Sequence, residues 1–211
     1  MHRFTDARDG DLAIGVDPAE LLARRDALAD GVAWTWLRQV HGAEVVVVDR
    51  PGAHAGAEAD AAVTVTPGVV LAVQTADCAP ILLSGPAGIG VVHAGWRGLV
   101  AGVVAAAAGA LESLGAPPVR AVLGPCIRGR CYEFGEPELT EIADRFGPSV
   151  RTRTAWDAPA LDLAAGVAAA CAELGLALED AGTCTACSPH HFSHRARGDL
   201  GRQALVARFD P

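Results

Sequence analysis

The chain has 211 residues, a formal net charge of −8 at pH 7, 51% hydrophobic residues and 20% charged residues. This composition predicts a folded protein with a sizeable core rather than a disordered one. The acidic charge argues against nucleic acids and anionic membrane surfaces as partners. The sequence contains neither lysine nor asparagine, which excludes a P-loop lysine, a Schiff-base lysine and N-glycosylation.

The sequence also predicts a cytoplasmic protein. Residues 1–6 show no apolar signal-peptide core, and the apolar run at 98–111 is too short to span a bilayer. Six cysteines in a chain of this size without a secretion signal are expected to be reduced thiols.

The predicted elements alternate between short strands and helices. Asp17, Pro18 and Glu20 are typical of a helix start and predict a helix that ends near Leu28, before Gly31. Apolar and β-branched runs predict strands at 45–48, 62–66, 69–73, 80–83, 89–92, 119–123 and 204–209. Runs that end at glycine predict helices at 99–114, 138–146 and 161–174. No linker or repeat separates these elements, so we expect one α+β domain over residues 1–211.

Three residues with metal-binding side chains lie in segments of unusual composition: His41 in Gln-Val-His-Gly, Cys78 in Thr-Ala-Asp-Cys-Ala-Pro and His93 in His-Ala-Gly-Trp-Arg-Gly. Two imidazoles and a thiolate suit a transition metal, and three protein ligands leave a fourth tetrahedral position open, as in catalytic zinc sites. Taken singly, such residues are often ordinary core or surface side chains. The hypothesis therefore requires that the fold bring the three together.

The sequence favours zinc over copper at these residues. A blue-copper site uses two histidines and a cysteine but adds a weak axial methionine or glutamine. Met1 is the only methionine, and Gln74 is the glutamine available near Cys78. A multicopper oxidase needs many more imidazoles, whereas this chain has seven histidines and no His-x-His pair. We therefore expect Zn²⁺ as the cofactor.

A second group of candidate ligands lies near the C-terminus. Cys184 and Cys187 form a Cys-x₂-Cys pair that is followed by His190 and His191, which is similar to a zinc knuckle. Pro189 and the adjacent histidines would make this loop cramped. The alternative is a surface loop with side chains that face a substrate.

Cys126 and Cys131 form a further pair. They do not match the Pro-Cys-x-x-Cys motif of nucleobase deaminases, and no His-x-Glu accompanies them. We interpret this pair as structural.

Arg97, Arg195 and Arg202 lie in turns that contain glycine or serine. In a chain without lysine, arginine is the side chain left to hold a phosphate, and the turn before the helix beginning near 98 also favours an anion. The alternative is that these arginines are solvated. Asp77, next to Cys78, is a candidate for orienting an imidazole or moving a proton.

Several of these motifs together resemble the YfiH/laccase-domain family, also called polyphenol oxidase-like. In chain order they are residues 39–42, 76–80, 93–98, 124–127 with 132–133, 192–195 and 201–203. The resemblance covers the chain from Trp36 to its C-terminus. It implies an α+β fold with a mixed β-sheet core flanked by helices, and one zinc ion held by His41, Cys78 and His93.

The resemblance also implies a function. Such proteins are zinc-dependent purine nucleoside phosphorylases that act on adenosine, inosine, guanosine and methylthioadenosine, with adenosine deaminase activity. The expected partners are purine nucleosides and phosphate, and the expected assembly is a monomer or a homodimer. On this basis Asp77, Arg97 and Arg195 are the expected catalytic residues, and His194 and Arg202 are expected to bind substrate.

Other activities remain open. Some bacterial members of the family are linked to peptidoglycan-precursor editing, in which an amidase removes L-serine from a UDP-muramyl intermediate. A metal-free thiol hydrolase built on Cys78 and His93, a copper polyphenol oxidase and a non-enzymatic sensor are further alternatives. Residues 193–196 read Ser-His-Arg-Ala where the family has Ser-Tyr-Arg-Arg, which puts phosphate or base recognition there in question.

Overall fold

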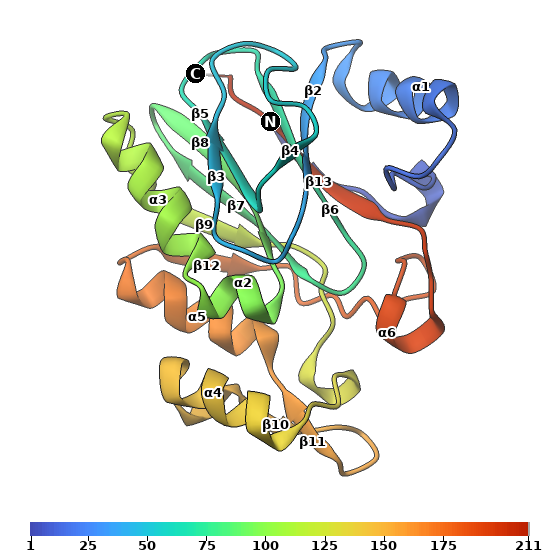
Figure 1. Cartoon of the computed structure of the whole chain (residues 1–211), viewed down its shortest axis with the longest axis vertical. Helices are drawn as coiled ribbons and strands as arrows, with labels where there is room; N and C mark the ends of the chain where they lie inside the picture. The colour runs from blue at the N-terminus through green and yellow to red at the C-terminus, as the bar shows by residue number, and fades with distance from the viewer. Residues whose placement is uncertain (211) are drawn as a thin grey trace.

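Two mixed β-sheets stack face to face, and helices cover both outer faces of the stack (Figure 1). The structure, a computed structural model, describes residues 1–210. Helices α2, α3 and α5 pack on the six-stranded sheet, α4 packs against α5 and α2, and α1 packs on the five-stranded sheet. The mixed sheets with flanking helices confirm the predicted fold class.

The helices are α1 (Pro18–Ala29), α2 (Trp96–Val100), α3 (Val103–Ser113), α4 (Glu136–Phe146), α5 (Leu163–Glu173) and α6 (His194–Arg197), with 3₁₀ turns at Ala7–Asp9, Gly129–Cys131 and Pro148–Val150. The strands are β1 (His2–Phe4), β2 (Trp34–Arg38), β3 (Val45–Val47), β4 (Ala57–Glu58), β5 (Ala61–Thr64), β6 (Val70–Thr75), β7 (Ala79–Gly85), β8 (Gly88–Ala94), β9 (Arg120–Leu123), β10 (Arg151–Arg153), β11 (Pro159–Leu161), β12 (Ala177–Asp180) and β13 (Gln203–Arg208).

Both large sheets mix parallel and antiparallel pairs. The five-stranded sheet has the order β1-β13-β6-β2-β4, in which β6, β2 and β4 are parallel neighbours. The six-stranded sheet has the order β12-β9-β7-β8-β5-β3, with parallel pairs at its two edges. Strand β6 ends in one sheet and β7 begins in the other, so the short connection 76–78 crosses between the layers.

Because side chains alternate along each strand, the buried residues of the five-stranded sheet divide into a cluster between the two sheets and a cluster under α1. In β6, Leu71 and Val73 face the space between the sheets, whereas Val70 and Ala72 face α1. This is the two-residue period expected of a strand that is buried on both faces. Burial on both faces explains why the strands of this chain contain few charged residues.

Most predicted elements are confirmed, with ends that differ by at most two residues. One prediction is wrong: the helix expected at 99–114 is two helices, α2 and α3, separated at Gly102. The backbone of Gly102 has φ of 87°, a left-handed conformation that interrupts the helix and that glycine adopts at little cost. The sequence also failed to indicate β2, which is buried through Trp34 on the face toward α1 and through Leu37 on the face between the sheets rather than through a β-branched run.

The two ends of the chain lie close together. Strand β1 pairs with β13, and the amino group of Met1 donates a hydrogen bond to the carbonyl of Arg208 (2.9 Å). Within the described residues, none of the helices has the length and apolar character required to cross a bilayer.

Candidate metal centre

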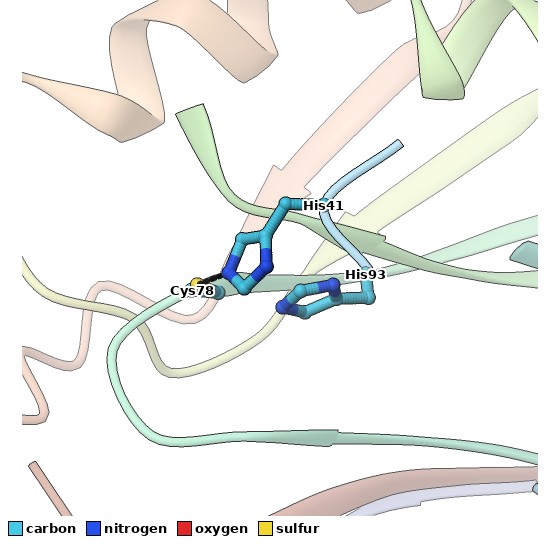
Figure 2. Close-up of side chains that lie close together, drawn as sticks. All are labelled: His41, Cys78 and His93. Carbon is cyan, nitrogen blue, oxygen red and sulfur yellow. Dashed lines mark hydrogen bonds between the residues drawn. The ribbon is translucent and has the colours of Figure 1, made fainter. Parts of the chain in front are cut away.

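His41, Cys78 and His93 come together where the ends of both sheets meet (Figure 2). His41 follows β2, Cys78 lies in the connection between β6 and β7, and His93 lies near the end of β8. Their ligand atoms all lie within 4.8 Å of one another, and Cys78 Sγ is 3.7 Å from His41 Nε2. The three residues are widely separated in sequence, so the site exists only in the folded chain.

The buried carboxylate of Asp60 fixes two of the three residues. Asp60 accepts hydrogen bonds from the backbone N–H groups of Val40 (3.2 Å), His41 (3.0 Å) and Gly42 (2.7 Å). Its Oδ1 also lies 2.8 Å from His93 Nδ1. Because Nδ1 of His93 faces this carboxylate, Nε2 is the ring nitrogen left to serve as a ligand.

Glycine lets the turn before α2 approach the site closely. A Cβ atom at Gly95 would lie 2.4 Å from His41 Cδ2 and 3.3 Å from Cys78 Sγ. A Cβ atom at Gly98 would lie 2.9 Å from the carbonyl oxygen of Gly42. The glycines of the His-Ala-Gly-Trp-Arg-Gly segment therefore leave the space that His41 occupies.

The charges of the site favour a thiolate. Burial by itself raises the pKa of Cys78, but the charge of His93 and a hydrogen bond from His41 lower it to about 6. Burial lowers the pKa of His93, whereas the Cys78 thiolate and the hydrogen bond to Asp60 raise it to about 9. Cys78 and His93 thus form a thiolate–imidazolium pair near neutral pH in the metal-free protein, and the thiolate is the form of cysteine that binds metals.

The arrangement of these side chains fits zinc. Zinc bonds of about 2.0 to 2.3 Å hold a nitrogen and a sulfur ligand about 3.5 Å apart in a tetrahedral site. The observed 3.7 Å between His41 Nε2 and Cys78 Sγ is close to that separation. The carboxylate that holds His93 is also the usual partner of a zinc-ligating imidazole.

The structure corrects one expectation for Asp77. Asp60, rather than Asp77, orients the imidazole of His93. The buried carboxylate of Asp77 instead accepts hydrogen bonds from Thr185 Oγ1 (2.6 Å), Ser193 Oγ (2.7 Å) and the backbone N–H of Arg195 (2.6 Å). Asp77 therefore ties the C-terminal segment to the loop that carries Cys78.

A cavity of about 510 Å³ opens over the three residues. Its lining includes the predicted substrate-binding residues His194 and Arg202, together with Gln74 and Thr75 from the end of β6. Apolar side chains also line it, among them Leu200, which is 79% exposed. The cavity therefore offers both charged and apolar contacts beside the candidate metal ligands.

Three arginines were expected to hold phosphate, and they occupy different places. Arg202 lies at the cavity over the metal ligands, where its Nη1 donates to the carbonyls of Leu200 (2.9 Å) and Gly201 (2.8 Å). Arg195 instead lines a second cavity of about 620 Å³. Arg97 is exposed, stacks over the Trp96 ring at 4.3 Å and lines neither cavity.

An aromatic cluster lies beside the second cavity, which Phe134 and Arg195 line. Phe134 makes edge contacts with Trp96 (5.6 Å between ring centroids) and Tyr132 (5.1 Å), and the guanidinium of Arg195 lies 5.0 Å from the Tyr132 ring centroid. Burial, followed by the charge of Cys78, raises the pKa of Tyr132 to about 12. Tyr132, which the sequence singled out only as part of the motif at 132–133, is therefore a neutral side chain near Cys78.

The second group of candidate ligands differs from the zinc knuckle that its sequence pattern resembles. Cys184 and Cys187 do lie together, but the third residue beside them is Cys131 rather than a histidine. His191 Nδ1 lies 2.8 Å from Ser188 Oγ. The interpretation of Cys126 as structural is consistent with its complete burial in the core, whereas Cys131 belongs to this cluster.

Comparison with known proteins identifies the family. Residues 8–210 match the family described as multi-copper polyphenol oxidoreductase laccase. The chain is 45% identical over 204 residues to a purine nucleoside phosphorylase of Streptomyces griseus, covering 91% of this chain and 82% of the relative. It is 40% identical over 203 residues to a purine nucleoside phosphorylase of Mycobacterium bovis, covering 92% and 81%. The chain belongs to this laccase-domain family, which includes YfiH.

Solved structures share the fold. YfiH of Bacillus licheniformis superposes with a TM-score of 0.83 at 23% identity, over 94% of this chain and 85% of that one. A Neisseria meningitidis protein gives 0.82 at 27% identity, over 95% and 86%, and YlmD of Geobacillus stearothermophilus gives 0.82 at 26%, over 95% and 85%. The architecture of stacked mixed sheets is therefore that of the family.

We predict that Asp60→Asn weakens zinc binding about 10- to 100-fold, because the amide presents one acceptor oxygen where the carboxylate presents two. The buried N–H groups that lose their acceptor should also lower the free energy of unfolding by about 1–3 kcal/mol. Competition with a zinc-chelating dye and urea unfolding measure the two effects. The exposed Asp49 provides a matched control, Asp49→Asn. Zinc affinity equal in the two variants would contradict the role of Asp60.

We also predict that alkylation of Cys78 in the metal-free protein follows a pH midpoint near 6. An unperturbed thiol ionises near pH 8.5, so the reaction should be fast at pH 7. Peptide-resolved mass spectrometry measures the rate, zinc should block it, and His93→Gln should raise the midpoint. A wild-type midpoint near 8.5 that His93→Gln leaves unchanged would show that the ion pair does not form.

Proposed function

We propose that this protein is a zinc-dependent purine nucleoside phosphorylase that accepts adenosine, inosine, guanosine and methylthioadenosine, and that it also deaminates adenosine. The observation that carries the proposal is the cavity of about 510 Å³ whose lining contains His41, Cys78 and His93. Its volume lies in the range of small-ligand sites. The purine nucleoside phosphorylase names of relatives that are 36 to 45% identical support the phosphorylase activity.

Polar residues at the end of β6 support a polar ligand in this cavity. Gln74 and Thr75 both line it, together with Gln39. Amide and hydroxyl groups of this kind exchange hydrogen bonds with ribose hydroxyls and purine ring nitrogens.

Arg202 is the residue that we assign to phosphate. Hydrogen bonds from its Nη1 to backbone carbonyls hold the guanidinium at the cavity. Within the described part of the chain, no hydrogen bond uses its Nε or Nη2, so these groups remain available for a bidentate contact with an anion. His194 lies at the same cavity, where its imidazole can contact the nucleoside.

His41, Cys78 and His93 would hold the zinc ion, which supplies a Lewis acid beside the bound substrate. Asp60 keeps Nε2 of His93 directed toward the ion by holding Nδ1. In phosphorolysis, the bond between ribose C1 and the purine nitrogen breaks, a bond from C1 to a phosphate oxygen forms, and the purine leaves with a proton. Arg202 would hold the phosphate for this displacement by charge and by the fixed position of its guanidinium.

The other expected catalytic residues take supporting roles in this proposal. Asp77 is a positioning residue, because its carboxylate is fully engaged with Thr185, Ser193 and Arg195. Arg195 reaches the second cavity rather than the metal ligands, and Arg97 lies on the surface over Trp96. We therefore assign phosphate binding to Arg202 rather than to Arg97 or Arg195.

Assay of the zinc-loaded protein with inosine and phosphate tests the proposal. We expect hypoxanthine release that requires phosphate and that is abolished by Cys78→Ser or by a chelator. Arg202→Gln should raise the KM for phosphate about 10- to 100-fold, since hydrogen bonds to charged groups contribute about 1.5–3 kcal/mol. Arg50→Gln, at an exposed arginine paired with Asp49, is the matched control and should leave KM unchanged.

Other outcomes of the same assay would identify the alternatives. Full activity in the chelated protein would contradict a zinc enzyme. Activity in the chelated protein that needs no phosphate and that Cys78→Ser abolishes would indicate a thiol hydrolase that uses Cys78 and His93. Turnover of a UDP-muramyl-serine substrate without turnover of any nucleoside would indicate the precursor-editing amidase. Binding of nucleosides without turnover would indicate a sensor.

A further inference from the structure

Three cysteines form a cluster away from the cavity over His41. Cys131 ends the 3₁₀ turn Gly129–Cys131, and Cys184 and Cys187 lie in the loop before α6. Their sulfur atoms all lie within 4.8 Å of one another, although more than 50 residues separate Cys131 from the other two. The fold thus brings three thiols together from two segments.

The spacing of the sulfur atoms differs from that of a disulfide. Cys131 Sγ and Cys187 Sγ are 3.3 Å apart, whereas a disulfide bond measures about 2.05 Å. Two thiolates bound to one tetrahedral zinc ion with bonds of about 2.3 Å lie about 3.8 Å apart. A shift of a few tenths of an ångström would therefore bring this pair to the spacing of two metal ligands.

The backbone of the Cys184–Cys187 turn is held in place. Ser188 N donates to the carbonyl of Cys184 (3.0 Å), and Thr185 N donates to the carbonyl of Cys126 (3.1 Å). The buried Thr185 hydroxyl donates to Asp77 (2.6 Å). The turn is therefore preorganised, and its sulfur atoms do not depend on a flexible loop for their positions.

Backbone N–H groups also surround the Cys184 thiol. These are the N–H groups of Arg128, Cys187 and Ala186. N–H groups of this kind stabilise the negative charge of a thiolate. Cys187 is exposed, so an ion from solvent can reach the cluster.

We propose that Cys131, Cys184 and Cys187 form a second metal site that binds a thiophilic d¹⁰ cation, with Zn²⁺ as the ion to be tested. Three thiolates are the ligands that such ions prefer. Each thiol releases its proton to solvent when it becomes a ligand. Within residues 1–210 the cluster has no fourth histidine, cysteine or carboxylate close enough to share the ion, so the remaining position is open to an exogenous ligand. The proposal does not depend on the proposed enzymatic function.

A metal ion at this site would link the segment that carries Cys131 to the loop that carries Cys184 and Cys187. Cys131 and Ala186 line the second cavity together with Arg195, so an ion bound here would fix one wall of that cavity. Cross-linking these segments should stabilise the folded chain, because metal binding to the native state adds to its free energy of unfolding.

Zinc content of the full-length protein, purified under reducing conditions and dialysed, tests the proposal. We expect about two zinc ions per chain in the wild type, and one fewer in Cys184→Ser and in Cys187→Ser. Cys78→Ser should lose the other ion and keep this one. His190→Ala, at an exposed neighbour outside the cluster, is the matched control and should keep both.

Cobalt provides a second readout. In the Cys78→Ser background, Co²⁺ should give the strong near-ultraviolet absorption of thiolate ligands, and adding Cys187→Ser should remove it. Since Cys187 is exposed, this variant should fold even if Cys184→Ser does not, which circular dichroism would verify. Unchanged zinc content in a folded Cys187→Ser, or a Cys131–Cys187 disulfide whose reduction yields no further zinc binding, would overturn the proposal. Loss of zinc only in Cys78→Ser would overturn it while leaving the proposed function intact.

Discussion

The candidate metal centre depends on one buried carboxylate. Asp60 accepts three backbone hydrogen bonds from residues 40–42 and faces His93 Nδ1. Burial opposes the ionisation of Asp60, but His93 and the N–H groups of Gly42 and Val40 keep its pKa below the ordinary value. A neutral residue at this place would leave the loop that carries His41 without its anchor and the ring of His93 without an orientation.

A second buried carboxylate, that of Asp77, also holds a neighbouring segment in place beside Cys78. Asp77 binds Thr185, Ser193 and Arg195, and so attaches the segment that precedes β13 to the crossing between the sheets. Thr185 neighbours Cys184, so the same contact joins the two candidate metal sites through the backbone. Asp60 thus organises the ligands of one site, and Asp77 organises the surroundings of both.

The sequence singled out His41, Cys78 and His93 because each lies in a short motif of unusual composition, and the structure shows that the three side chains meet. It did not reveal Asp60, which lies in an alanine-rich stretch between motifs, where the signal was an acidic residue directly before the buried strand β5. Cys131 was also missed as a partner of Cys184 and Cys187, because that pairing depends on a long-range contact. The sequence predicted one continuous helix at 99–114, because a single glycine in an alanine-rich run is compatible with a helix. Only the φ of Gly102 in the structure shows that the helix is interrupted there.

We propose that His41, Cys78 and His93 hold one zinc ion in a site that Asp60 organises. Anomalous X-ray scattering from crystals of the zinc-loaded protein, recorded on both sides of the zinc absorption edge, would locate this ion. We expect a zinc peak about 2.0–2.3 Å from His41 Nε2, Cys78 Sγ and His93 Nε2, with His93 Nδ1 still bound to Asp60. The absence of such a peak among these three side chains in zinc-loaded crystals would contradict the proposed zinc site.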